Sequence, residues 1–215
     1  TDAIDTWARN VTFRRMKITN FDDAIVPKPT NLGYQISKCT ENILAEDIES
    51  TFTVGMTIGS VPPSTNHQCM RNITFRNIKM DFPIKGIYIK PNPGHSGDGV
   101  IENILYENVV MNTPIWWGIW IGPQQQYQPG GTLQGCSMIY PFSSFCQTQP
   151  RITMRDITLR NITSTNSLLP AGVILCNSTN PCTNFTFENV NMRTPFWDAL
   201  GIGYVNHFSE GVSIN

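Results

Sequence analysis

A nine-residue pattern recurs six times along the chain and constrains its fold more than any other feature. The copies are NVTFRRMKI from Asn10, NILAEDIES from Asn42, NITFRNIKM from Asn72, NILYENVVM from Asn103, RITMRDITL from Arg151 and NFTFENVNM from Asn184. Most copies begin about 30 residues after the previous one, a spacing typical of repeat architectures. The one longer step contains an insertion from Gln124 to Pro150. Each copy alternates apolar and polar residues, so the pattern predicts strands and not helices.

A shorter apolar segment follows each copy. These segments are AIVPK (24–28), GMTIG (55–59), GIYIK (86–90), GIWIG (118–122), GVILC (172–176) and, more loosely, LGIGY (200–204). Their second and fourth residues are apolar, as in Ile87 and Ile89. We therefore expect these two positions to face a core, and the first, third and fifth positions to face outward.

Two or three short strands per repeat, with no helical segment, predict the coil of a parallel β-helix. We expect an all-β fold, a right-handed single-stranded parallel β-helix of about six coils that spans residues 1–215 as one domain, with an insertion loop at about 124–150. The chain begins and ends inside the repeat, so we expect no obvious terminal cap. A β-sandwich would instead need turns every 8–12 residues or so and no long period. Polar residues that stack should form ladders, and the candidates are Asp47, Asn77, Asn108, Asp156 and Asn189.

The composition excludes several classes of partner. Charged residues make up 14% of the chain and the formal net charge is −1, with no basic run, so no nucleic-acid or anionic-membrane partner is expected. No apolar stretch approaches the roughly 20 residues that cross a bilayer. His67, His95 and His207 are scattered and no two cysteines form a CxxC pair, so we expect no metal and no other cofactor.

The six cysteines indicate an oxidised protein. Cys39 and Cys69 each lie three residues before a copy of the repeat, so stacking would bring them about 4.8 Å apart, within reach of a disulfide. We predict the disulfides Cys39–Cys69, Cys136–Cys146 and Cys176–Cys182. Glycosylation sequons occur at Asn10, Asn72, Asn161, Asn177 and Asn184. Together these features favour a secreted, extracellular protein. Because the chain opens in TDAIDTW without a signal peptide, we expect a mature chain or a fragment.

Aligning the short segments predicts which side chains share an outer wall. The third position reads Val26, Thr57, Tyr88, Trp120 and Ile174, and the fifth reads Lys28, Gly59, Lys90, Gly122 and Cys176. Asp22 and Asp23 come just before the first segment, and Asp2 lies about one strand earlier. Such a wall suits a sugar-acid polymer, with carboxylates for proton transfer, lysines for substrate carboxylates and aromatic faces for ring stacking.

Other interpretations of these residues stay open. Two aspartates before a strand often form a turn that hydrogen-bonds its own backbone, and a lysine on a strand is often only solvated. Trp116 and Trp120 should face outward, and Trp117 should face the core.

Four short motifs on these residues resemble those of the polygalacturonase family of glycoside hydrolases, whose members are right-handed parallel β-helices with the pectin-lyase-like fold. TDAID at 1–5 resembles the family's Asn-Thr-Asp, and FDD at 21–23 resembles Gly-Asp-Asp with Phe21 in place of glycine. TVGMTIGS at 53–60 resembles the Gly-His-Gly region with Val54 in place of histidine. YIK at 88–90 resembles Arg-Ile-Lys with Tyr88 in place of arginine.

This resemblance implies that Asp2, Asp22 and Asp23 are the acid and base carboxylates and that Lys90 contacts substrate. Tyr88, Trp120 and Lys28 are further substrate-binding candidates by their place on the wall. Inverting glycosidases use a carboxylic acid and a carboxylate roughly 6.5–9.5 Å apart. Crowding should raise the pKa of one aspartate. We expect Asp23 to be the acid and the other two to hold the attacking water.

The leading hypothesis is a secreted hydrolase that acts on a cell-wall or extracellular polysaccharide by inverting acid–base hydrolysis, with activity that the two motif substitutions weaken or abolish. The alternative is a non-catalytic structural or adhesive glycoprotein whose unpaired strand edges stack end to end into oligomers or filaments. A third hypothesis is a calcium-dependent pectate lyase that uses the three aspartates as metal ligands.

Overall fold

Two parallel sheets form the body of the molecule. The structure is a computed structural model, and it describes residues 1–29, 39–61, 67–94, 98–125, 135–143, 146–207, 209–210 and 213–214. The longer strands are β2 (Arg9–Thr19), β4 (Cys39–Thr51), β6 (His67–Asp81), β8 (Asp98–Asn112), β10 (Ile152–Thr165) and β12 (Cys182–Met192), with β14 (Ser209–Glu210) and β15 (Ser213–Ile214) beside β12. The shorter strands are β1 (Ile4–Thr6), β3 (Ile25–Pro27), β5 (Met56–Val61), β7 (Ile87–Pro91), β9 (Ile119–Ile121), β11 (Gly172–Leu175) and β13 (Tyr204–His207).

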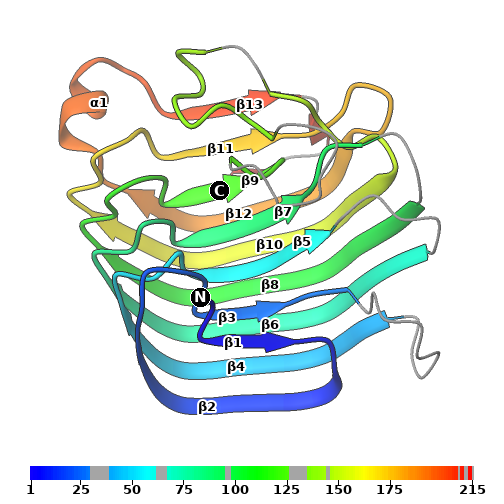
Figure 1. Cartoon of the computed structure of the whole chain (residues 1–215). Helices are drawn as coiled ribbons and strands as arrows, with labels where there is room; N and C mark the ends of the chain where they lie inside the picture. Colours follow the sequence, from blue (N-terminus) through cyan, green and yellow to red (C-terminus); the bar gives the residue numbers. More distant parts are fainter. Residues whose placement is uncertain are drawn as a thin grey trace.

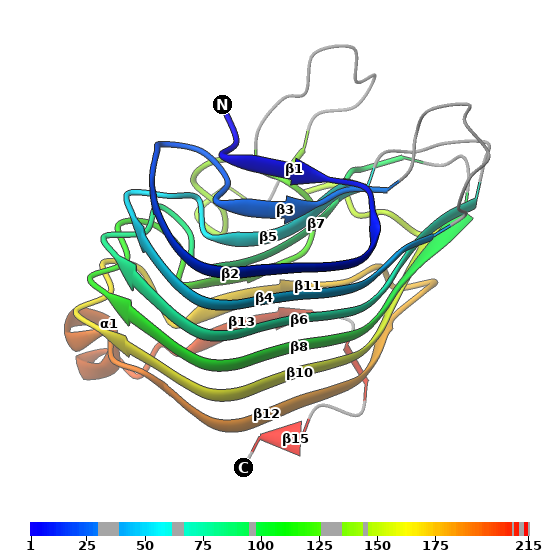
Figure 2. The same cartoon turned by 90° about the horizontal axis from the view of Figure 1, so that it is seen from below.

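The chain alternates between the two sheets, so each sheet pairs strands that are one repeat apart. The short sheet runs in the order β1-β3-β5-β7-β9-β11-β13, and the long sheet runs from β2 through the even-numbered strands (Figure 1). Figure 2 shows the long strands bending around one side of the short ones. The predicted all-β parallel solenoid is confirmed, and it makes about five turns because six repeats leave five steps between them.

Asparagine shapes the long strands. The backbone bends at two recurrent positions, where residues such as Asn72 (φ 53°) and Asn77 (φ 55°) adopt the left-handed conformation. Asparagine tolerates this conformation better than most residues. Its side chain then donates to the coil below: Asn72 Nδ2 lies 3.1 Å from Asn42 Oδ1, and Asn77 Nδ2 lies 3.0 Å from Asp47 Oδ1. The repeat therefore encodes both the bend and the ladder that locks neighbouring coils in register.

The predicted ladder is wrong at one position, Asp156. Asp156 pairs with Asn103 in the first column, and Asn161 continues the second column by donating to Asn108 Oδ1 at 3.0 Å. The fifth copy of the repeat begins at Asp156 and not at Arg151. The insertion hid this five-residue shift, because Arg151 and Asp156 both begin segments with the same alternation.

The main core fills the space between the sheets. Stacked apolar residues from successive coils, such as Ile43, Ile73 and Ile104, are fully buried there. The glycine that opens the short segments is required by this close stacking, since a Cβ on Gly55 would lie 2.0 Å from the carbonyl oxygen of Gly86. All three predicted disulfides are present: Cys39–Cys69, Cys136–Cys146 and Cys176–Cys182.

A second apolar cluster lies on the outer face of the short sheet, where the sequence analysis expected an open surface. Its members are Tyr88, Trp117, Trp120, Cys136, Tyr140, Val173 and Leu175. Trp120 lies on this outer face as predicted, but it is 0% exposed, so the expectation of an open, solvent-facing side chain is wrong. The described part of the insertion covers it, with the Tyr140 ring 6.0 Å from the Trp120 ring. Trp117 is buried as predicted, but in this second cluster.

Two short segments were misaligned. In β11, Val173 pairs with Trp120 and Ile174 with Ile121, so Ile174 faces the main core and not the outer wall. The last segment, 200–204, was expected to be a strand, but β13 begins only at Tyr204. A helix that the sequence analysis did not expect, α1 (Pro195–Ala199), precedes it and has proline in its first turn. No helix in the described residues is long and apolar enough to cross a membrane.

Candidate active site

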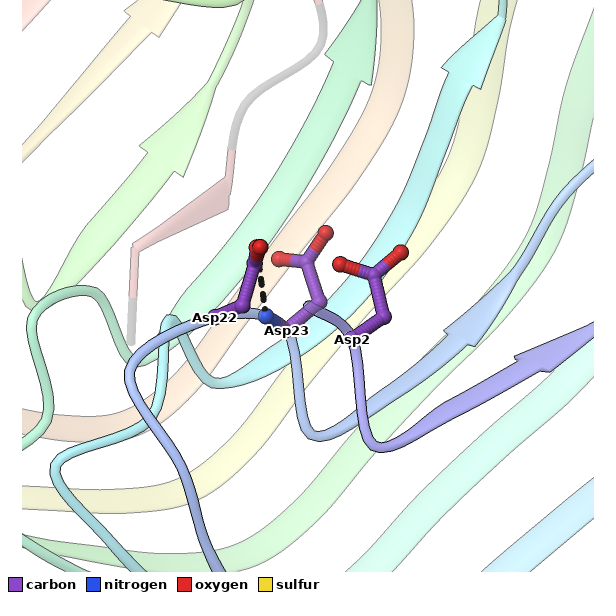
Figure 3. Close-up of side chains that lie close together, drawn as sticks. All are labelled: Asp2, Asp22 and Asp23. Atoms are coloured by element: carbon purple, nitrogen blue, oxygen red, sulfur yellow. Dashed lines mark hydrogen bonds between the residues drawn. The ribbon is translucent and has the colours of Figure 1, made fainter.

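The three aspartates of the first two motifs meet at one edge of the short sheet. Ile4 pairs with Ile25, which places Asp2 and Asp23 on neighbouring rungs of the stack, each two residues before its strand. One carboxylate oxygen from each of Asp2, Asp22 and Asp23 lies within 4.8 Å of the others. Figure 3 shows the three side chains pointing to the same side of the chain. The stack therefore brings together the carboxylates that the sequence analysis selected.

Asp23 is the most enclosed of the three. Its side chain is 1% exposed. Lys90 Nζ donates to Oδ2 at 2.6 Å, and Thr57 Oγ1 donates to Oδ1 at 2.6 Å. Burial raises the pKa of Asp23 above its usual range, and the opposing effects of Lys90 and Thr57 do not cancel that rise. The nearby charge of Asp2 adds to it. Burial thus favours the protonated form of Asp23.

Asp2 and Asp22 are more accessible to solvent. Lys28 Nζ donates to Asp2 Oδ2 at 2.6 Å and also lies 2.8 Å from Asp5 Oδ1. Burial disfavours the charged form of Lys28, but its hydrogen bonds to Asp2 and Asp5 outweigh burial and raise the pKa of Lys28. Asp22 Oδ1 accepts the backbone N–H of Asp23 at 3.0 Å. The turn interpretation of this aspartate pair is therefore also correct, because Asp22 holds the loop that presents Asp23.

A pocket of about 230 Å³ opens beside the aspartates. It is lined by Asp22, Val54, Ile84, Lys85, Tyr88, Lys90, Ile115, Trp116 and Met138. Two motif positions stand on its wall: Val54, where the related family has histidine, and Tyr88, where it has arginine. Trp116 is half-buried, and its Nε1 donates to Gln125 Oε1 at 3.3 Å. The described lining of the pocket thus combines the carboxylate of Asp22 with the aromatic rings of Tyr88 and Trp116, and a sugar-binding role stays a prediction.

The structure changes the surroundings of the expected substrate-binding residues. Lys90 and Tyr88 line the pocket, but both side chains are buried, and Lys90 is paired with Asp23. Trp120 does not line it, and its Nε1 donates to the carbonyl of Pro123 at 2.9 Å. Lys28 is held by two carboxylates. The described part of the insertion covers Trp120, whereas carboxylates from other coils hold Lys28 and Lys90.

Lys85 was not among the site residues predicted from the sequence. It lies two residues before Ile87, the first residue of β7, in the same column as Asp2 and Asp23. Its Nζ lies 4.1 Å from the centre of the Tyr88 ring and 5.6 Å from that of Trp120. Burial lowers the pKa of Lys85 to about 7, and the charge of Lys90 acts in the same direction while Asp23 opposes it. Extending the column alignment one residue upstream of each short segment would have found it.

The three aspartates are also the group in the described residues with the spacing of a metal site. Calcium takes six to eight oxygen ligands in most proteins. Here Lys28 holds Asp2 and Lys90 holds Asp23, so lysine ammonium groups already neutralise two of the three carboxylates. This arrangement argues against the calcium-dependent lyase hypothesis.

The predicted glycosylation sites lie mostly on the long sheet. Asn10, Asn72, Asn161 and Asn184 occupy left-handed bends, and Asn177 Nδ2 donates to Thr148 Oγ1 at 2.6 Å. Asn72, Asn161 and Asn184 also donate their amide nitrogen within the ladders. Glycan attachment stays a prediction.

Comparison with known proteins places these features in context. The model of the glycosyl hydrolases family 28 matches residues 1–199. Probable rhamnogalacturonase C of Aspergillus flavus is 26% identical over 216 residues, covering 100% of this chain and 40% of that protein. Exopolygalacturonase clone GBGA483 of Arabidopsis thaliana is 28% identical over 153 residues, covering 71% of this chain and 31% of that protein.

A solved structure shares the fold. The crystal structure of endo-xylogalacturonan hydrolase from Aspergillus tubingensis superposes with a TM-score of 0.59 at 14% identity, covering 95% of this chain and 50% of that one. The chain thus spans less than half the length of the two curated relatives and half the length of this structure.

Proposed function

Because this chain belongs to the glycosyl hydrolases of family 28, we propose that it hydrolyses glycosidic bonds in a pectic polysaccharide outside the cell. The names of its relatives support this substrate class, since they include a rhamnogalacturonase, an exopolygalacturonase and a xylogalacturonan hydrolase. The disulfides support a secreted location. The observation that carries the proposal is the meeting of three carboxylates beside a pocket.

Asp23 is the proposed general acid. It gives its proton to the glycosidic oxygen as the bond from that oxygen to the anomeric carbon breaks. A water molecule held by Asp2 and Asp22 attacks the anomeric carbon and loses a proton to one of them. The raised pKa of Asp23 supports the acid role, because burial favours the protonated form that can donate a proton. Lys28 donates a hydrogen bond to Asp2 and so orients it for the base role.

The separation of the carboxylates differs from the expectation of roughly 6.5–9.5 Å for inverting enzymes. The reason is that Asp2 and Asp23 stand on adjacent rungs, which fixes their oxygens within 4.8 Å. Carboxylates this close fall nearer the range of retaining enzymes. Inversion therefore depends on Asp2 and Asp22 holding the water together, and the anomeric configuration of the first product, followed by proton NMR, tests it. A product that retains its configuration would instead make one of these two aspartates the nucleophile.

The activity itself is tested by release of new reducing ends from polygalacturonan and rhamnogalacturonan. Asp23→Asn should lower the rate by about 10²–10⁴-fold, the usual contribution of a general acid. Asp81→Asn on the long sheet is a matched control, because Asp81 lies on the other sheet from the aspartate cluster and should leave the rate unchanged. Equal rates for the wild-type protein and Asp23→Asn would remove the proposal.

A second candidate function is a non-catalytic, structural or adhesive role in the extracellular space. Two observations favour it: Val54 and Tyr88 replace the histidine and arginine of the related motifs, and Lys90 closes a buried ion pair on the proposed acid. This protein would assemble through the edges of its sheets. Electron micrographs that show filaments, together with no hydrolysis of any pectic polymer, would establish this role over the first.

A further inference from the structure

Lys85 is a buried cation without a carboxylate partner. Its side chain is 7% exposed, and it rests on the faces of Tyr88 and Trp120. Among the residues that the structure describes, no carboxylate lies within ion-pair distance of its ammonium group. An uncompensated buried charge destabilises the folded state, so it is rarely kept without a use.

Two of the nearby carboxylates are held by other lysines. Asp23 is bound by Lys90, and Asp2 is bound by Lys28. From the segment before β9, the groups that line the pocket beside Lys85 are the uncharged Ile115 and Trp116. Asp22 also lines the pocket but forms no ion pair with Lys85, so an anion that enters would find the Lys85 ammonium group available.

The pocket fits such an anion when it is carried by a sugar. Its volume of about 230 Å³ is below the roughly 300–1,000 Å³ of pockets for drug-sized ligands, so it suits a single ring. Lys85 and Tyr88 are both on its wall, and Asp22 joins it to the aspartates. A carboxylate against Lys85 would form a charge-assisted hydrogen bond, and the ring would lie against aromatic side chains.

We propose that Lys85 is a specificity-determining residue that binds the carboxylate of one uronic acid unit of the substrate in this pocket. The inference rests on the proposed function and names the unit that the site selects. Tyr88 stands where the related motif has arginine, and Lys85 supplies a positive charge over the Tyr88 ring from three residues earlier in the chain. The positive charge at this pocket therefore comes from position 85 instead of position 88.

The test compares one oligosaccharide in two forms: a short galacturonate oligomer, and the same oligomer with its carboxyl groups reduced to alcohols. Dissociation constants come from the fluorescence of the tryptophans beside the pocket, and kcat/KM comes from new reducing ends. Lys85→Met keeps the apolar length of the side chain and removes its charge. Lys79→Met, at a partly exposed lysine of the long sheet, is the matched control.

Lys85→Met should bind the acidic oligomer at least about tenfold more weakly than the wild-type protein, the loss of one charge-assisted hydrogen bond. Binding of the reduced oligomer should not change, and Lys79→Met should behave as the wild-type protein does with both. Equal losses for both oligomers, or no loss for either, would overturn the inference.

A second variant, Lys85→Arg, tests the inference through its pH dependence and does not depend on whether Lys85→Met folds correctly. Affinity of the wild-type protein for the acidic oligomer should fall as the pH rises through about 7, where Lys85 loses its proton. Lys85→Arg stays charged, so its affinity should remain constant over this range. The same fall in both proteins would refute the role of Lys85.

The outcomes separate this inference from the proposed function. Binding of the acidic oligomer that depends on Lys85, without hydrolysis by the wild-type protein, would remove the hydrolase proposal and leave the binding site. Hydrolysis that does not change in Lys85→Met would leave the hydrolase and remove the role of Lys85.

Discussion

Replacing Lys90 by methionine should expose how strongly the fold depends on the charge balance around Asp23. The two groups form a buried ion pair with Nζ and Oδ2 2.6 Å apart, and both side chains are almost fully inaccessible. Methionine has a similar length but no charge. Lys90→Met therefore leaves the Asp23 carboxyl buried with Thr57 as its hydrogen-bond donor.

The expected cost is about 3–5 kcal/mol in the free energy of unfolding at pH 7, the usual result of removing one partner of a buried pair. The cost should be smaller at pH 4. Burial already raises the pKa of Asp23, and loss of Lys90 raises it further, so in the variant more of the carboxyl is neutral at pH 4 than at pH 7. Ionising it as the pH rises then destabilises the folded state, because the unfolded chain ionises more easily.

Urea unfolding at the two pH values measures this effect. Asp23→Asn/Lys90→Met should recover part of the stability, because no buried charge is left. Lys17→Met is the control for an exposed pair: Lys17 lies 3.0 Å from Glu49 with both side chains largely exposed, and such pairs contribute about 0–1 kcal/mol. A cost of under 1 kcal/mol for Lys90→Met, or a cost that does not vary between pH 4 and 7, would refute this account of the pair.

Three further changes test the fold and the site. Asn77→Ala should destabilise the protein by about 2–3 kcal/mol, because alanine loses both ladder hydrogen bonds and tolerates the left-handed bend poorly. Asn77→Gly should cost less, because glycine adopts the bend without strain. Equal costs of the two variants in urea unfolding would contradict the bend argument. The free energy of unfolding of the wild-type protein should rise by about 2–3 kcal/mol from pH 6 to 9. Above pH 7 the buried Lys85 has lost its proton, whereas the same lysine in the unfolded chain still holds one, so a rising pH favours the folded state. Lys85→Met should show no such rise. Replacing Cys39 and Cys69 by serine should lower the free energy of unfolding by about 3–4 kcal/mol. Removing the Cys176–Cys182 disulfide should cost less, because it closes a shorter loop and so restricts the unfolded chain less. Thermal unfolding that ranks the two disulfides in the reverse order would count against this reasoning.

The sequence alone predicted the features that depend on local periodicity. Alternation of apolar and polar residues identified the strands, because a strand that buries one face alternates with period two. Recurrence of this pattern about every thirty residues identified the coil. The same register predicted that Cys39 would meet Cys69 and that Asp2 would meet Asp22 and Asp23. Contacts between equivalent positions of neighbouring coils can be predicted in this way, since their separation in space follows from the repeat.

The tertiary structure decided which residues are covered and how their charges are balanced. Trp120 was expected to be exposed but lies under an insertion that carries no repeat, so periodicity could not reveal its cover. The same insertion concealed that the fifth repeat begins at Asp156. Lys85 became a candidate only when its burial, its aromatic neighbours and the lysines that hold the aspartates were seen together. The sequence thus determined the stack and the meeting of the acids, whereas burial and electrostatic pairing depend on distant groups and emerge only when the chain has folded.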